Sequence, residues 1–229
     1  MSTWIKICGT TNIEDARLAV AAGTDALGFI FAPSPRQVNV LDVHAIAGQV
    51  KEVERIGLFV NETTEKIVDT FERADLTGVQ LHGDEPPDHV ASVRDRLRSI
   101  APRARIIKTV RFTPQFATEL MRFSKPGLVD AILVDAFSSH ARGGTGITFD
   151  WEQAREAVRR ANIPIIIAGG LTPENVQHAL AILEPWGVDA TSGLEAQPGR
   201  KDAKKVQAFC AAIKNFRAAE AAEFVKEKI

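Results

Sequence analysis

The sequence contains little cysteine and no long apolar run. Cys8 and Cys210 are the two cysteines among 229 residues, too few for a disulfide framework and compatible with a reducing compartment. No apolar stretch approaches the roughly 18 residues that a membrane span needs. The N-terminal segment also lacks the charged and apolar regions of a secretory signal peptide. We therefore expect a cytoplasmic protein with no membrane partner.

A strong net charge is absent as well. The formal charge at pH 7 is -1, so the chain offers no basic surface of the kind that binds nucleic acid. No group of His, Cys, Asp and Glu has the spacing of a metal site, and we expect no metal. The hydrophobic content of 45% and the charged content of 25% are ordinary for a globular protein, and the length suits one large domain.

Short runs rich in Ile and Val alternate with amphipathic segments along the chain. Such runs are typical of strands buried on both faces, and their alternation with helices predicts right-handed βαβ units and a parallel sheet. Eight units favour closure into a (β/α)₈ barrel. The main alternative is an open doubly wound sheet, but its Gly-rich dinucleotide loop does not follow the first strand here. The predicted strands are Trp4–Cys8, Ala26–Phe31, Ile56–Val60, Gly78–Leu81, Arg105–Thr109, Ala131–Val134, Ile163–Ala168 and Val188–Thr191.

Capping residues mark several of the helices between these strands. Asn12 is the expected N-cap of the first helix and Gly23 its stop, while Thr172 is the expected N-cap of a later one. The stretch between Thr109 and Asp130 has a weaker helical pattern. We expect one barrel domain over residues 1–217 and a helical tail over 218–229 that extends the last helix. The clearest predicted helices are Ile13–Ala22, Thr63–Ala74, Glu174–Leu183 and Asp202–Phe216.

Active sites of such barrels lie at the C-terminal ends of the strands. Period-two alternation turns Trp4, Lys6 and Cys8 into the barrel, and Leu133 and Asp135 likewise. Cys8 and Asp135 then lie near the mouth on strands that are not neighbours. That separation suits one base and one acid acting on a ligand between them.

Each of these residues also has a purely structural interpretation. Cys8 could be a small core side chain, as we expect of Cys210, although the Lys6 ammonium on its face would favour a thiolate. Asp135 could bind a backbone amide, but burial at the end of an apolar strand would raise its pKa and keep it protonated. For His82 a structural hydrogen-bonding role is favoured over ligand contact.

Glycine-rich segments follow the seventh and eighth strands, where this fold commonly binds phosphate. Gly169 and Gly170 come after one strand, and Ser192 and Gly193 after the other. Glycines allow backbone N–H groups to approach an anion, although they also serve simple tight turns. Residues 143–146, which include Gly144, form either a flap or a further source of amides.

Together these features resemble the phosphoribosylanthranilate isomerase family of tryptophan biosynthesis. The resemblance implies a barrel enzyme that needs no cofactor and carries out an Amadori rearrangement, the third step from chorismate to tryptophan. Leu194 and Ala136 stand where the family often has Val and Ser. The matching segments are residues 6–9, 34–36, 57–61, 79–85, 134–135, 143–146, 149–151, 168–171, 173–176, 188–189, 192–195, 199 and 201–202.

The resemblance also implies residue roles. Cys8 is the general base and Asp135 the general acid, and Arg36 meets the carboxylate of a phosphorylated small-molecule substrate. Two alternatives stay open: a related barrel with another isomerase or synthase reaction, and a phosphate-binding subunit without activity. Monomer and homodimer both fit. The other implied substrate contacts are His82, Gly144, Gly169, Gly170, Ser192 and Gly193.

Overall fold

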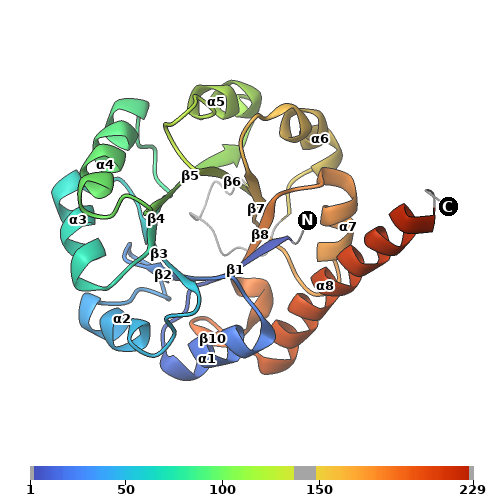
Figure 1. Ribbon diagram of the computed structural model, residues 1–229, viewed down its shortest axis with the longest axis horizontal. Helices are drawn as coiled ribbons and strands as arrows, with labels where there is room; N and C mark the ends of the chain where they lie inside the picture. The colour runs from blue at the N-terminus through green and yellow to red at the C-terminus, as the bar shows by residue number, and fades with distance from the viewer. Residues whose placement is uncertain (1–2, 137–147, 227–229) are drawn as a thin grey trace.

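Eight parallel strands close into a barrel in chain order in the computed structural model, which describes residues 3–136 and 148–226 (Figure 1). Each strand pairs with the next, and the last pairs with the first. The prediction of a (β/α)₈ barrel is thereby confirmed. The strands are β1 (Trp4–Cys8), β2 (Ala26–Ile30), β3 (Glu54–Phe59), β4 (Gly78–Leu81), β5 (Arg105–Phe112), β6 (Ala131–Ala136), β7 (Ile165–Ile167) and β8 (Gly187–Ala190).

The helices form a ring around the barrel (Figure 1). A short 3-10 helix, η1 (Ser192–Leu194), and a small hairpin of β9 (Glu195–Gln197) and β10 (Arg200–Lys201) follow β8. The last helix projects beyond the ring toward the C-terminus and continues to Lys226, within the segment expected as a tail. The helices are α1 (Ile13–Ala22), α2 (Val40–Ala47), α3 (Thr64–Arg73), α4 (Pro87–Ile100), α5 (Phe116–Phe123), α6 (Trp151–Arg160), α7 (Val176–Leu183) and α8 (Ala203–Lys226).

The caps explain where these helices start. The Asn12 side chain accepts a hydrogen bond from the backbone N–H of Asp15, and Gly23 ends α1 with φ 89°, both as predicted. Thr172 was wrong as the N-cap of α7, which begins at Val176. The Asn175 amide donates to the carbonyl of Gly170, and its oxygen accepts from the N–H of Thr172, so residues 172–175 fold into a separate turn.

The weak helical pattern after Thr109 has a simple cause. Strand β5 continues to Phe112, and the eight-residue helix α5 occupies only Phe116–Phe123. A short helix shows too few turns for a clear 3.6-residue period. None of the helices in the described part of the chain is both long and apolar enough to cross a membrane.

The two faces of each strand contact different layers, as the alternation predicted. Ile5, Ile7, Ile132 and Val134 belong to the apolar cluster between barrel and helices. Trp4 and Leu133 belong instead to a cluster inside the barrel, and Cys8 lies in a second interior cluster with Ile30 and Leu58. The interior is therefore a packed core at one end and leaves room only at the other.

The N-terminal end of the barrel is sealed by aromatic and charged side chains. Trp4 stacks on Trp186 with ring centroids 5.1 Å apart. The Arg105 guanidinium lies over both rings and forms two hydrogen bonds with the Glu54 carboxylate. Cation–π contact and a two-point ion pair thus stabilise the same closure.

Candidate active site

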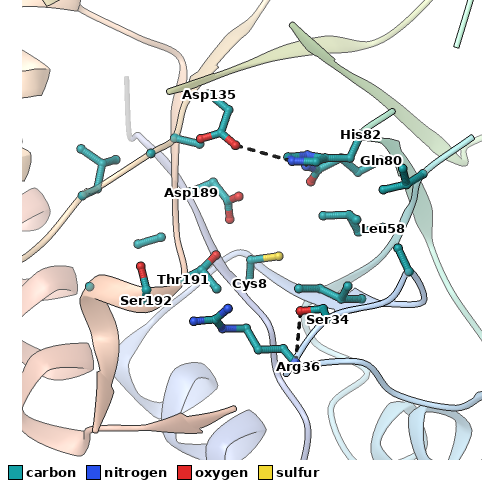
Figure 2. Close-up of a pocket in the computed structure, with 18 of the residues that line it drawn as sticks. Cys8, Ser34, Arg36, Leu58, Gln80, His82, Asp135, Asp189, Thr191 and Ser192 are labelled. Carbon is teal, nitrogen blue, oxygen red and sulfur yellow. Dashed lines mark hydrogen bonds and ion pairs between the residues drawn. The ribbon is translucent and has the colours of Figure 1, made fainter. Parts of the chain in front are cut away.

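A cavity of ≈ 330 Å³ opens at the C-terminal ends of the strands, where the sequence placed the site. Residues from β1, β4, β6 and β8 face one another across it (Figure 2). Gly144 lies outside the described residues. The other expected site residues, Cys8, Arg36, His82, Asp135, Gly169, Gly170, Ser192 and Gly193, all line this cavity.

Asp135 occupies the end of β6 and is 7% exposed. The pKa of its carboxyl is raised from 3.8 to about 6, first by burial and then by the nearby Asp189 carboxylate. The backbone N–H of Ala136 and the cations Arg111 and Lys6 act in the opposite direction. A carboxyl with this pKa keeps its proton up to about pH 6, well above the range of an ordinary aspartate, and can donate it, as a general acid does.

Cys8 faces the same cavity from β1, and only 2% of it is exposed. Burial raises the pKa of the Cys8 thiol above its ordinary value. Lys6 lowers this pKa, as the sequence predicted, but its effect is smaller than that of burial, and Asp189 raises the pKa again. The free site therefore favours the thiol over the expected thiolate.

The Lys6 ammonium is fully buried, and its Nζ lies 2.9 Å from Oδ1 of Asp189. Burial alone would lower the pKa of Lys6, but Asp189 and Cys8 together raise it above its ordinary value. The pairing was missed from sequence, although both residues lay in predicted strands. Closure of the barrel makes β1 and β8 neighbours with Lys6 opposite Asp189, and two inward charges of opposite sign were the available signal.

Gly28 on β2 makes room for this pair of side chains. A Cβ atom at Gly28 would lie 2.6 Å from Sγ of Cys8 and 3.0 Å from Cε of Lys6. Cys8 and Gly28 are register partners in adjacent strands, so the missing side chain faces the thiol directly. Gly28 could not be identified from the sequence, because a glycine inside a strand does not reveal which neighbour needs the space.

Arg36 is anchored by an acidic partner, Glu195, which was not assigned from the sequence. Its Nε and Nη2 atoms donate to the Glu195 carboxylate at 2.7 to 3.1 Å. Lys201 also contacts Glu195, and the hydrogen bond from Arg36 and the Lys201 ammonium lower the pKa of Glu195 against the effect of burial. Within the described residues these bonds leave Nη1 of Arg36, at the cavity wall, for a ligand.

The glycine loops after β7 and β8 approach each other closely. Gly169 and Gly170 have φ of 86° and 64°, the left-handed region that favours glycine. A Cβ at Gly193 would lie 2.1 Å from the carbonyl oxygen of Leu171. Among the described residues, no acceptor is paired with the N–H of Gly169 or Gly170. Unpaired amides at a cavity wall are suited to an anion such as phosphate.

His82 fits both roles considered from the sequence, structural hydrogen bonding and ligand contact. It lines the cavity, yet it also contacts protein groups on both sides of its ring.

Within the described residues, no group of three or more His, Cys, Asp and Glu is arranged to hold a metal ion.

Comparison with known proteins places this chain in a family. Residues 5–212 match the family model of N-(5'-phosphoribosyl)anthranilate isomerase. The chain is 44% identical over 207 residues to the isomerase of that name from Geobacter sulfurreducens, covering 90% of this chain and 95% of the relative.

Solved structures agree. The phosphoribosylanthranilate isomerase of Thermotoga maritima superposes with TM-score 0.80 at 37% identity, covering 93% of this chain and 99% of that one. A structure of such an isomerase in complex with reduced 1-(o-carboxyphenylamino)-1-deoxyribulose 5-phosphate has TM-score 0.77 at 35% identity, with the same coverage. The chain therefore belongs to the N-(5'-phosphoribosyl)anthranilate isomerase family.

Proposed function

We propose that this isomerase of tryptophan biosynthesis converts N-(5-phospho-β-D-ribosyl)anthranilate into 1-(2-carboxyphenylamino)-1-deoxy-D-ribulose 5-phosphate, with Asp135 as general acid and Cys8 as general base. The carrying observation is that these two groups face one cavity from strands on different sides of the barrel (Figure 2). The raised pKa of Asp135, about 6, supports the acid role.

The reaction proceeds in three steps. Asp135 gives its proton to the furanose ring oxygen, the bond from that oxygen to C1 breaks, and the amine nitrogen supplies the electrons for an iminium at C1. The Cys8 thiolate then removes the proton on C2, and the electron pair neutralises the iminium to give an enolamine. Finally C1 gains a proton and the C2 hydroxyl loses one, which gives the ketone without net oxidation.

The thiolate needs a counter-charge, since burial favours the thiol in the free site. Two cations supply it: the Lys6 ammonium, which lowers the pKa of Cys8, and the iminium formed on the substrate itself. Formation of the iminium beside Cys8 therefore strengthens the base at the moment when it acts.

The ends of the substrate fit opposite walls of the cavity. The phosphate accepts the unpaired N–H groups of Gly169 and Gly170, next to Ser192 and Gly193. The anthranilate carboxylate accepts hydrogen bonds from Arg36. We further propose a cytoplasmic protein that is a monomer or a homodimer; one solved structure with TM-score 0.77 is of monomers generated from the dimeric isomerase of Thermotoga maritima.

Conversion of freshly prepared phosphoribosylanthranilate by the purified protein tests the proposal. Cys8→Ala and Asp135→Asn should each abolish turnover while leaving the fold intact, and full activity in either variant would overturn the mechanism. Rescue of a tryptophan auxotroph that lacks this step, compared with a histidine auxotroph, distinguishes this substrate from the aminoaldose of the histidine pathway.

A further inference from the structure

Three buried side chains, from β4, β5 and the residue after β4, meet beside Asp135. Nδ1 of His82 lies 3.0 Å from Nε2 of Gln80 and 2.9 Å from Oγ1 of Thr109. Gln80 also donates to Thr109 at 3.2 Å. On the other side of the imidazole, Nε2 of His82 faces Oδ2 of Asp135 at 3.5 Å (Figure 2).

The chemistry of these groups determines which imidazole nitrogen carries the proton. An amide nitrogen only donates, so a proton on Nδ1 of His82 would point at the N–H₂ of Gln80 only 3.0 Å away. Nδ1 is therefore the acceptor, and the Thr109 hydroxyl can donate to it as well. In the neutral ring the proton then lies on Nε2, directed at Asp135.

We propose that His82 is a positioning residue for Asp135: Gln80 and Thr109 fix its Nε2–H tautomer, and this N–H orients the Asp135 carboxyl and stabilises the carboxylate that remains after proton transfer. The tautomer rests on the orientation of the Gln80 amide, whose nitrogen faces His82 and whose buried oxygen has no partner among the described residues, whereas the catalytic consequence rests on the proposed function. The contact of 3.5 Å is long for a hydrogen bond, and it shortens when Asp135 acquires its negative charge.

Other charged groups act on Asp135 and must be kept unchanged in a test. Asp189 on β8 raises the pKa of Asp135, and Arg111 on β5 and Lys6 on β1 lower it. His82 approaches from the end of β4 and, in its neutral form, supplies an N–H dipole. A substitution at His82 leaves the other three in place, so the resulting change in Asp135 reports the loss of the N–H donor.

Nitrogen-15 NMR of ring-labelled histidine measures the tautomer directly. The chain has five histidines, and loss of one signal set in His82→Gln assigns the resonances. We expect an unprotonated Nδ1 and a protonated Nε2 in the wild type. Gln80→Glu replaces the amide donor by an acceptor and should move the proton to Nδ1, whereas Gln80→Met should retain Nε2–H through Thr109. A wild-type spectrum with protonated Nδ1 would overturn the proposal.

The effect on Asp135 is measured in the ligand-free protein by carbon-13 NMR of its carboxyl. His82→Leu removes the donor to the carboxylate and should raise the pKa of Asp135 by about one unit, whereas His82→Gln, which can place an N–H near the same point, should restore part of the shift. Equal pKa values in all three proteins would refute a positioning role.

Activity separates this inference from the proposed function. The pH at which kcat levels off should move upward in His82→Leu together with the pKa of Asp135. If the protein shows the Nε2–H tautomer but does not isomerise phosphoribosylanthranilate, the proposed function fails and the tautomer stands. If it isomerises this substrate but Nδ1 carries the proton, the inference about His82 fails alone.

Discussion

Lys6 and Asp189 form an ion pair inside the barrel, with Nζ 2.9 Å from Oδ1, although 183 residues separate them in the chain. Both side chains are at least nine-tenths buried, and Asp189 forms part of the cavity wall between Cys8 and Asp135 (Figure 2). The pair therefore links the environment of the proposed base to that of the proposed acid.

Removing the cation should harm both stability and activity. Lys6→Met leaves Asp189 buried without its partner, and we expect a loss of about 3–5 kcal/mol in the free energy of unfolding. Urea denaturation measures this change. Arg73→Met is the matched control, because it breaks the exposed Arg73–Asp69 pair and should change little. An equal loss of unfolding free energy in both variants would show that the buried Lys6–Asp189 pair stabilises the fold no more than an exposed ion pair.

Lys6→Met should also reduce the reactivity of Cys8. Lys6 lowers the pKa of the thiol, so its removal should shift alkylation by iodoacetamide to higher pH. A Cys210→Ala background ensures that only Cys8 is alkylated. An unchanged alkylation profile would mean that Lys6 does not influence the thiol.

The pH dependence of turnover should follow Asp135. The proposed acid must start protonated, and its pKa is raised to about 6, so its protonated fraction falls about tenfold per pH unit above that value. The thiolate fraction of Cys8 rises over the same range, because burial raises the pKa of its thiol above the ordinary value, so kcat/KM should level off above about pH 6. A rate that rises steadily through this range would contradict the acid role.

Asp135 should also affect stability with a definite sign. The folded protein holds the proton up to about pH 6, whereas the unfolded chain releases it near 3.8, so stability declines as pH rises between these values. Asp135→Asn removes this charge, and at pH 8 it should be more stable than the wild type by on the order of 2 kcal/mol, with a smaller difference at pH 4. Urea denaturation at the two pH values measures it.

Gly28→Ala should disturb Cys8, the proposed base, without altering any polar group. The new Cβ would meet Sγ of Cys8 at 2.6 Å, and we expect destabilisation by about 1–3 kcal/mol and a large loss of kcat. Gly48→Ala is the control, because its Cβ would meet only backbone atoms at 3.7 Å or more. Wild-type kinetics in Gly28→Ala would show that the space is not needed.

Much of the site could be predicted because it depends on strand alternation. The inward faces of β1 and β6 and the residues at their ends follow from a period of two, and these place Cys8 and Asp135 at one mouth. The family resemblance added Arg36, which the cavity also includes.

What escaped prediction depends on closure and on distant partners. The ion pair of Lys6 needs β1 beside β8, and the anchoring of Arg36 needs Glu195 from the segment after β8. The prediction of Thr172 as a helix N-cap failed because Asn175 forms a turn before α7. The hydrogen bond from the Asn175 side chain to Gly170 has no signature in the sequence. Raised pKa values likewise come from burial that only the folded barrel creates.

Trp4, Trp186 and Arg105 close the N-terminal end of the barrel, so within the described residues the active-site cavity opens at the opposite end. Substrate and product must use the same passage, so product departure has to precede each new entry, and accumulated product competes directly with substrate. The closed N-terminal end also lies far from the residues at the cavity mouth. Substitutions that stabilise the closed N-terminal end should therefore raise the melting temperature without changing the residues at the cavity mouth on which turnover depends.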